Sequence, residues 1–375
     1  MTDRAVSQTA KTSQTAHANF MQCAIDLAKK GLNTTTPNPC VGCVIVKNGQ
    51  IIGRGFHQQA GLPHAEINAL QALGDSGYSA RGATAYVTLE PCSHYGRTPP
   101  CADALVKAGV VEVVIGSHDP NPDVSGRGVA TLRRAGIVVS EGVLREQCDA
   151  LNRGFFKRMT KGLPWVTVKL GMTLDAKIAT ASGESQWITG EAARADVQNL
   201  RARACAVMTS SATVIADNPS LNVRLPNTQR QPKRVIVDRQ RRVSPQANIF
   251  ALAGQVIVYT CIDNDRTVFT AADQAVRYVT VGEKNHYPDL HAVLADLAQN
   301  RQCNNVLVEA GGRFVGALLA EDLVDELIVY TAPMLLGDGA TPAFRFPAVQ
   351  KLVDAKRFSI DDCRIIGGDV KLTFR

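Results

Sequence analysis

The stretch Thr88–Cys101, TLEPCSHYGRTPPC, holds the residues of this chain best suited to chemistry. Cys92 and Cys101 are separated by eight residues, and each directly follows a proline. Such a pair could form a disulfide, a redox couple or part of a metal site. Residues 1–15 are polar and lack the apolar run of a secretory signal, which favours a cytoplasmic location where thiols stay reduced. The two cysteines are therefore expected to bind a metal or to act in catalysis.

A second stretch, GLPHAEINAL, supplies the donors that would complete a metal site. Pro63 is suited to begin a helix, which predicts His64 and Glu66 in the first turn, where both can address a centre beyond the helix N-terminus. One imidazole, two thiolates and one open position make a catalytic zinc site. We therefore predict His64, Cys92 and Cys101 as zinc ligands and Glu66 as an unligated acid/base.

This donor set suits hydrolysis of an amine. Zinc lowers the pKa of bound water from about 15.7 to about 7, and the free carboxylate can carry a proton to a leaving amino group. The pattern H-x-E followed by P-C is typical of zinc deaminases, although their second cysteine follows after two residues rather than eight. A purely structural zinc would need a fourth protein ligand, for which no convincing residue is present.

Two further groups compete for the same role. Cys40 and Cys43 form a C-x-x-C, but CVGCVIV has the composition of a strand, on which residues three apart face opposite ways. We interpret both as core residues. His94 is an alternative ligand, placed below His64 because it has no neighbouring acid.

The surrounding elements predict an α/β domain. Helical patterns over 20–32, 64–73, 101–108 and 127–135 alternate with strand-like runs, and two of these runs meet in a hairpin at Asn48-Gly49. Charge, Gly162 and Pro164 interrupt the pattern, so a boundary is predicted near residue 160. We expect a disordered tail over 1–15, a zinc domain over 16–160 and a second domain over 161–375.

The second half again alternates strands and helices, which predicts a mostly parallel sheet with ligands at the carboxyl ends of its strands. It has no G-x-G-x-x-G dinucleotide fingerprint. VLVEAGGRFVGALL runs from a strand through Gly311-Gly312 into a helix, where backbone N–H groups could hold a phosphate. On the residues alone, a tight strand-to-helix turn explains these glycines equally well.

Charge and hydropathy narrow the classes of partner. The chain carries a formal net charge of +7, but its basic residues are scattered apart from RQRR at 239–242. Small phosphorylated molecules therefore fit better than nucleic acid. No apolar run approaches the roughly 20 residues that a membrane helix needs, so we expect no membrane partner.

These motifs resemble a known family. TPNPCVGCVIV, PHAE and TLEPCSHYGRTPPC are similar to the deaminase half of the bifunctional riboflavin-biosynthesis proteins, and KLGMTLDAKIA, SGESQWITG, SSATVIADNPSLNVR and VEAGGRFVGALL are similar to their reductase half. The resemblance implies a cytidine-deaminase-like α/β/α sandwich followed by a dihydrofolate-reductase-like α/β domain. It implies zinc-dependent deamination of 2,5-diamino-6-(5-phosphoribosylamino)pyrimidin-4(3H)-one, then reduction of its ribosyl group to ribityl by NADPH.

The same resemblance assigns residues in the second half. Those expected to bind NADPH are Gly171, Trp187, Thr213, Asp217, Gly311, Gly312, Arg313, Phe314, Val315 and Gly316. Those expected to face the phosphorylated substrate are Lys169, Ser185, Arg201, Leu221, Arg224 and Glu309. Arg201 has an alternative role, since a cation in the last turn of a helix complements the helix dipole.

Three points stay open on the sequence. Arg239, which follows the strand RVIVD, could reach the 2′-phosphate of the cofactor. Lys169 and Asp217 are both polar candidates near the reacting sugar, without an assigned proton donor. The rival interpretation is a zinc-dependent deaminase of nucleobases or nucleic acid, which leaves residues 161–375 unexplained. We also expect a homo-oligomer.

Overall fold

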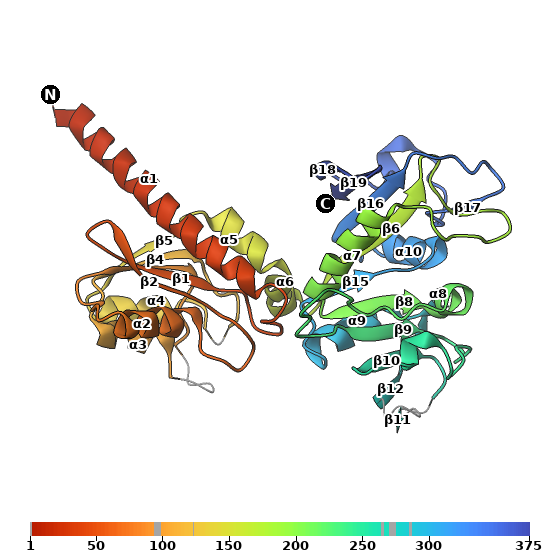
Figure 1. Ribbon diagram of the computed structural model, residues 1–375, viewed down its shortest axis with the longest axis horizontal. Coiled ribbons are helices and arrows are strands. Elements are labelled where there is room, and N and C mark those ends of the chain that lie inside the picture. Colours follow the sequence, from red (N-terminus) through yellow and green to blue (C-terminus); the bar gives the residue numbers. More distant parts are fainter. Residues whose placement is uncertain (1, 94–98, 123, 264–265, 270–274, 285–286) are drawn as a thin grey trace. The chain divides into compact units, whose positions relative to one another are not determined.

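The computed structural model describes residues 2–93, 99–122, 124–263, 266–269, 275–284 and 287–375. The chain divides into two compact units, Met1–Lys161 and Gly162–Arg375, next to the boundary expected at residue 160. Among the described residues, the first unit holds a five-stranded sheet and the second a ten-stranded sheet. Figure 1 labels the strands of both sheets and the helices around them. In the described part of the chain, no helix is long and apolar enough to cross a membrane.

The first unit is a three-layer sandwich. Its sheet has the order β2-β1-β3-β4-β5, in which β1 is antiparallel to β2 and β3, while β3, β4 and β5 run parallel. The elements are α1 (Thr2–Ala28), η1 (Lys29–Gly31), β1 (Gly42–Lys47), β2 (Gln50–Phe56), α2 (Ala65–Asp75), β3 (Thr84–Leu89), α3 (Cys101–Ala108), β4 (Glu112–Ser117), α4 (Arg127–Arg134), β5 (Val138–Glu141), α5 (Arg145–Leu151) and α6 (Arg153–Lys161).

Alternation along the strands builds the two apolar layers of this sandwich. Ile45 and Val87 face a core shared with α2, α3 and α4, whereas Val44 and Tyr86 face a core shared with α1 and α5. The predicted hairpin is present, with positive φ at Asn48 (51°) and Gly49 (75°), as a two-residue turn of primed type requires.

Helix α1 begins at Thr2, whereas the sequence predicted a helix only from Phe20 and a disordered tail over 1–15. Residues 2–20 contain no proline or glycine, and their alanines, glutamines and basic residues are compatible with a continuous helix. Later turns of this helix bury apolar side chains against the sheet, among them Met21 and Ile25. The packing pattern that the sequence analysis used therefore locates the docked part of the helix and not its beginning.

The second unit is built on a mostly parallel sheet, as predicted. Its order is β11-β12-β10-β9-β8-β15-β6-β16-β19-β18, with the seven strands from β12 to β16 parallel and β11, β19 and β18 antiparallel to their neighbours. The helices are α7 (Glu191–Arg203), α8 (Ser211–Asp217), α9 (Leu290–Gln299), α10 (Gly312–Ala320), η2 (Asn248–Phe250) and η3 (Leu352–Asp354).

The strands of the second unit are β6 (Trp165–Thr173), β7 (Lys177–Ala179), β8 (Ala206–Ser210), β9 (Lys233–Val237), β10 (Val256–Thr260), β11 (Arg266–Phe269), β12 (Ala275–Thr280), β13 (Glu283–Lys284), β14 (Tyr287–Pro288), β15 (Asn305–Val308), β16 (Glu326–Ala332), β17 (Thr341–Pro342), β18 (Ile360–Ile366) and β19 (Asp369–Phe374). Helices α9 and α10 pack on one face of the main sheet, and α7 and α8 contribute to the cores on the other. The carboxyl ends of β8, β15 and β6 meet at one edge.

Candidate metal centre and reductase site

The predicted zinc ligands lie together in the first unit. His64 Nδ1 is 3.6 Å from Cys92 Sγ and 3.4 Å from Cys101 Sγ, and the three donor atoms all lie within 4.8 Å of one another. Tetrahedral zinc with Zn–N near 2.05 Å and Zn–S near 2.3 Å requires an N···S separation of about 3.6 Å. The donor set and its spacing therefore fit zinc, and the described residues supply three of the four ligands of a tetrahedral site.

Local structure explains how the chain brings these three residues together. His64 is the N-cap of α2 in extended conformation, so it precedes the helix instead of lying in its first turn as predicted. Cys101 is the first residue of α3, as predicted. Cys92 follows the end of β3 in irregular structure, and its Sγ accepts a hydrogen bond of 3.3 Å from Cys101 N–H at the start of α3.

The acidic groups of this cluster lie close together and shift one another's pKa values. Hydrogen bonding with Cys101 is the main cause that lowers the pKa of Cys92 to about 4, and the adjacent Cys92 sulfur raises the pKa of Cys101. Glu66 is buried, and burial together with Cys92 raises its pKa to about 7. The contact with Cys92 raises the pKa of His64. Glu66 thus lies against the three donors without belonging to the donor set.

One supporting residue was missed by the sequence analysis. His57 is buried, and its ring lies edge-on to that of His64 with 5.3 Å between the ring centroids. Its Nδ1 lies 3.1 Å from the carbonyl oxygen of Pro63 and its Nε2 lies 3.1 Å from the side-chain amide of Asn38. The carbonyl contact places the proton on Nδ1, so the ring is held in one orientation behind His64. No local motif marked it, since it follows the end of β2 and is not part of the helix that His64 caps.

The competing cysteines behave as expected. Cys40 and Cys43 are both buried, and Cys43 belongs to the core between the sheet and α2. His94, the alternative ligand, lies outside the described residues.

In the second unit, several predicted residues meet at the carboxyl ends of β6, β8 and β15. Gly311 N–H donates to Thr213 Oγ1 at 3.2 Å, and Ser185 Oγ donates to Asp217 Oδ1 at 3.3 Å. Among the described residues no side chain caps α10, and a Cβ added to Gly311 would meet nothing within 4 Å. The start of this helix is therefore open to an anionic group, which fits the pyrophosphate of a dinucleotide.

A charged cluster lies beside this helix start. Arg201 forms a bidentate ion pair with Glu309, with Nε–Oε1 2.6 Å and Nη2–Oε2 2.9 Å, and its third nitrogen donates to the carbonyl of Asn222 at 3.0 Å. Burial raises the pKa of Glu309, but the combined effect of Arg201, Lys169 and Arg224 outweighs burial, so the pKa of Glu309 is lowered. Burial lowers the pKa of Lys169, partly offset by attraction to Glu309. Every nitrogen of Arg201 is thus engaged within the protein.

Other predicted residues are not part of this grouping. Phe314 and Val315 are buried in the core, and a Cβ on Gly316 would lie 1.8 Å from the carbonyl oxygen of Arg345, so chain packing requires this glycine. Leu221 is also buried in the core.

The remaining predicted residues of the second unit differ in their exposure and contacts. Arg239 is paired with Glu283 at 2.9 Å. Trp187 is exposed under the guanidinium of Arg194, 4.5 Å from the ring centroid. Arg224 is exposed, and so is Arg313 in the first turn of α10. Gly312 packs on the carbonyl of Pro342, and Gly171 packs near Thr189.

Comparisons with known proteins agree with this division. Residues 14–117 match the family model "Cytidine and deoxycytidylate deaminase zinc-binding region", and residues 164–372 match "RibD C-terminal domain". Riboflavin biosynthesis protein RibD of Escherichia coli is 48% identical over 94% of this chain and 97% of its own length, and that of Haemophilus influenzae is 47% identical over 95% and 96%.

Solved structures give the same result. A structure of Acinetobacter baumannii RibD aligns with a TM-score of 0.87 and 46% identity over 96% of this chain and 99% of its own. A Thermotoga maritima protein, described as a diaminohydroxyphosphoribosylaminopyrimidine deaminase/5-amino-6-(5-phosphoribosylamino)uracil reductase, aligns with a TM-score of 0.87 and 35% identity over 97% and 99%.

The second family match accounts for the half of the chain that a nucleobase or nucleic-acid deaminase leaves unexplained. Both predicted halves of the resemblance are confirmed over nearly the full length. The chain belongs to the RibD family of bifunctional riboflavin-biosynthesis enzymes, in which a zinc-dependent deaminase domain is joined to an NADPH-dependent reductase domain.

Proposed function

We propose that the first unit removes the 2-amino group of 2,5-diamino-6-(5-phosphoribosylamino)pyrimidin-4(3H)-one, with His64, Cys92 and Cys101 holding zinc and Glu66 moving the proton. The observation that carries this assignment is the N···S spacing of 3.4 and 3.6 Å, which matches the separation that tetrahedral zinc needs. When bound, zinc acts as a Lewis acid that makes water acidic near neutral pH. The name of the Thermotoga maritima relative supports the choice of pyrimidine.

Residues of the chain itself carry out the proton transfer and orient the metal ligand. Glu66 lies against both cysteines and His64 but outside the donor set, so its carboxylate is free to accept a proton from the attacking water. It returns that proton to the leaving amino group, and hydrolysis yields a carbonyl and ammonia. The buried ring of His57 fixes the orientation of His64 from behind.

In the second unit we propose that NADPH, which supplies the hydride that reduces ribosyl to ribityl, binds at the open start of α10. Gly311, Thr213 and the exposed Arg313 lie there, and Ser185 and Asp217 are joined to each other by a hydrogen bond. The uncapped N–H groups suit the pyrophosphate. Packing limits Phe314, Val315 and Gly316 to a supporting role behind this turn.

We further propose that Arg224 binds the substrate phosphate and that Arg201 acts indirectly. Arg224 is exposed, and its Nη1 lies 3.4 Å from Asn222 Oδ1. Arg201 already satisfies Glu309 and a carbonyl, so it positions Glu309 beside Lys169. The 2′-phosphate role of Arg239 is unsupported, because Glu283 already neutralises this side chain. Cytoplasmic location and homo-oligomeric assembly stay with this proposal as expectations from the biosynthetic role.

The test of the deaminase assignment is Glu66→Gln. This variant should retain about one zinc per chain, because Glu66 is not a ligand, and should lose deamination by a factor on the order of 10² or more. Zinc content by elemental analysis and release of ammonia from the diaminopyrimidine substrate are the two measurements. Loss of zinc together with activity would mean that Glu66 is a ligand and that the roles are assigned wrongly.

A further inference from the structure

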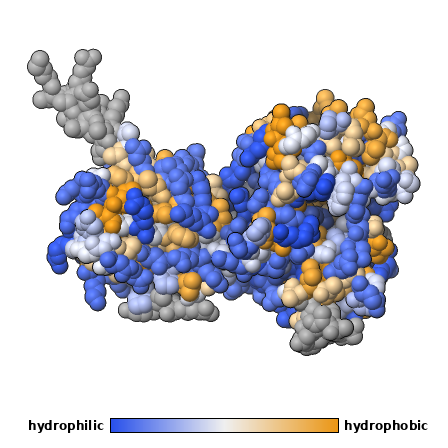
Figure 2. Space-filling model, viewed as in Figure 1, coloured by the Kyte–Doolittle hydropathy of each residue, from blue (hydrophilic) through white to orange (hydrophobic). Residues whose placement is uncertain are grey.

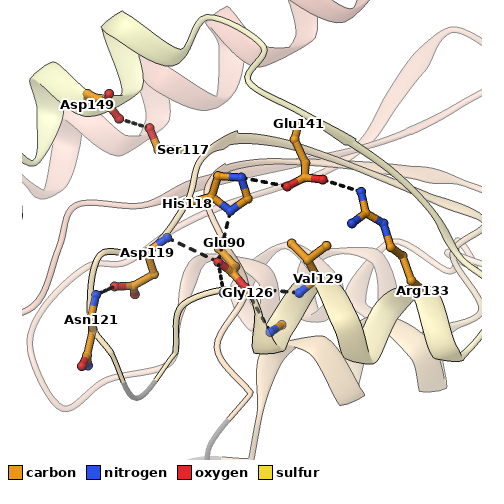
Figure 3. Close-up of polar contacts among 11 residues, drawn as sticks. Glu90, Ser117, His118, Asp119, Asn121, Gly126, Val129, Arg133, Glu141 and Asp149 are labelled. Atoms are coloured by element: carbon orange, nitrogen blue, oxygen red, sulfur yellow. Dashed lines mark hydrogen bonds and ion pairs between the residues drawn. The ribbon is translucent and has the colours of Figure 1, made fainter.

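A buried acid lies two residues before the ligand Cys92, outside the group that the reaction uses. Glu90 follows the end of β3, and its side chain is fully buried. Its carboxylate accepts four backbone hydrogen bonds, from Asp119 (3.4 Å) and Gly126 (3.1 Å) on Oε2 and from Gly128 (3.0 Å) and Val129 (3.2 Å) on Oε1. Figure 3 shows the carboxylate directed into the turn that begins α4.

The Glu90 carboxylate caps the N-terminus of α4. The N-cap of α4 is Gly126, which has no side chain to satisfy the first N–H groups of the helix. Glu90 satisfies them from another element, and its negative charge is favoured at a helix N-terminus. A cap normally comes from the residue that precedes the helix. Here it comes from the segment that leads from the sheet to a metal ligand.

A second observation ties the same helix to the same segment. A Cβ added to Gly128 would lie 2.0 Å from the carbonyl oxygen of Pro91, so the backbone of α4 packs directly on the peptide between Glu90 and Cys92. Glu90 N–H also donates to the carbonyl of Ser117 at 2.8 Å, which extends the pairing of β3 with β4. The backbone of residues 90 and 91 is therefore held on two sides.

An outer layer of charges surrounds the carboxylate. His118 lies between Glu90 and Glu141, with Nδ1 3.5 Å from Glu90 Oε2 and Nε2 2.8 Å from Glu141 Oε2. Arg133 of α4 pairs with Glu141 in turn. Figure 3 shows this chain of side chains leading from the buried acid towards α4 and the end of β5. These contacts favour a single orientation of the Glu90 carboxylate.

We propose that Glu90 is a positioning residue for Cys92: by locking the β3 exit onto the start of α4, it sets the place of the Cys92 sulfur for zinc. The proposal rests on the zinc ligands assigned above. Cys92 Sγ also accepts the Cys101 N–H from the start of α3, and its carbonyl accepts the Ala102 N–H at 3.1 Å. The sulfur is thus fixed between two helix starts, one acting on it directly and the other through Glu90.

The test is Glu90→Gln in the full-length protein, with Glu112→Gln as the matched control. Glu112 begins β4, where it accepts hydrogen bonds from Thr84 and Ser140 at the opposite end of the same strands. The amide at position 90 keeps the shape of the side chain but turns an NH2 group towards two of the four donors. We expect zinc affinity, measured by competition with a chromogenic chelator, to fall about 10- to 100-fold in Glu90→Gln and to stay within about threefold in the control.

Replacement of zinc by Co(II) gives a readout that a merely structural role would not change. The visible and thiolate-to-cobalt bands of Glu90→Gln should shift relative to wild type, since the sulfur has moved, whereas those of Glu112→Gln should not. Deaminase kcat should fall with KM little changed, because the perturbed group is the metal ligand rather than a substrate contact. The thermal midpoint of each metal-free variant reports the loss of stability separately.

The outcomes separate the two proposals. If the wild-type protein binds no zinc at all, the assigned function of the first unit is wrong. If wild type binds zinc, and Glu90→Gln has the same affinity and cobalt spectrum with only a lower thermal midpoint, Glu90 is a structural cap and the positioning role is overturned. Should Glu90→Gln not fold, Gly128→Ala decides, because it retains the Glu90 side chain while its Cβ pushes on the Pro91 carbonyl; unchanged zinc affinity there would also overturn the proposal.

Discussion

Replacing Arg201 by alanine should destabilise the reductase unit far more than it weakens substrate binding. The side chains of Arg201 and Glu309 are only 11% and 13% exposed, and they share two hydrogen bonds of 2.6 and 2.9 Å. Removing one partner of such a pair leaves an unpaired buried charge and costs about 3–5 kcal/mol. The nearby Lys169 offers Glu309 partial compensation, so we expect the lower end, about 3 kcal/mol.

The tryptophans make this measurement specific to one unit. The chain has two, Trp165 and Trp187, and both belong to the unit Gly162–Arg375. Urea unfolding followed by tryptophan fluorescence therefore reports the reductase unit without interference from the other. With a slope of about 2 kcal/mol per M, a loss of 3 kcal/mol lowers the midpoint by about 1.5 M.

Arg203→Ala is the matched control. Arg203 lies in the same last turn of α7 but is exposed, so its truncation should change stability by no more than about 0.5 kcal/mol. The reasoning is refuted if Arg201→Ala unfolds like this control and instead raises KM for the phosphorylated substrate but not for its dephosphorylated analogue. Arg201 would then bind the phosphate directly.

The stability difference between wild type and Arg201→Ala should depend on pH with a defined sign. The pKa of Glu309 is lowered in the folded protein from its ordinary value of 4.5, because Arg201, together with Lys169 and Arg224, outweighs the opposing effect of burial. The stabilisation from the pair is therefore complete above pH 4.5 and is lost as the pH falls through the folded-state pKa. The difference in the free energy of unfolding between wild type and Arg201→Ala should be large at pH 7 and should decrease below pH 4.5. A difference that is constant with pH would contradict the ion-pair assignment.

Three further variants test the site assignments. Cys92→Ala should lose stoichiometric zinc and deamination while still oxidising NADPH with the already deaminated substrate; loss of both activities in a folded protein would contradict independent sites. Arg224→Ala should raise KM for the phosphorylated substrate about ten- to a hundredfold, with NADPH affinity unchanged, and an unchanged preference over the dephosphorylated analogue would exclude the phosphate role. Gly316→Ala should destabilise the reductase unit by about 1–3 kcal/mol, measured by tryptophan fluorescence, because its Cβ meets the Arg345 carbonyl; wild-type stability with weakened NADPH binding would contradict a packing role.

The zinc centre could be predicted from the sequence because its information is local. His64, Cys92 and Cys101 each directly follow a proline. Pro63 and Pro100 lie just before helices α2 and α3, as expected because the fixed φ and missing N–H of proline suit a helix start. The one local error concerned His64, which is the N-cap rather than a first-turn residue. A proline before a helix marks the region in which the helix begins and not the first helical residue.

The reductase roles were less predictable, because they depend on contacts between distant segments. Arg201 and Glu309 are 108 residues apart, and nothing near either residue indicates that they neutralise each other. Arg239 meets Glu283 across 44 residues for the same reason. Gly316 stands in a glycine-containing turn that suggests a phosphate site, yet its lack of a Cβ serves the close approach of Arg345. Sequence motifs indicated which segments reach the site edge, but not which side chains there remain free.

Negative charge is concentrated around the metal centre, and the N-termini of two helices donate hydrogen bonds to the acidic groups there. Two thiolates and Glu66 lie together at this centre, the buried Glu90 stands two residues before Cys92, and a divalent cation offsets only two of these charges. The N-terminus of α3 donates to Cys92, and that of α4 donates to Glu90. Because such N–H groups favour anions without adding a titratable cation, they can compensate the acids while leaving Glu66 as the group that exchanges a proton. This arrangement explains why an acid that takes no part in the reaction is placed directly before a metal ligand.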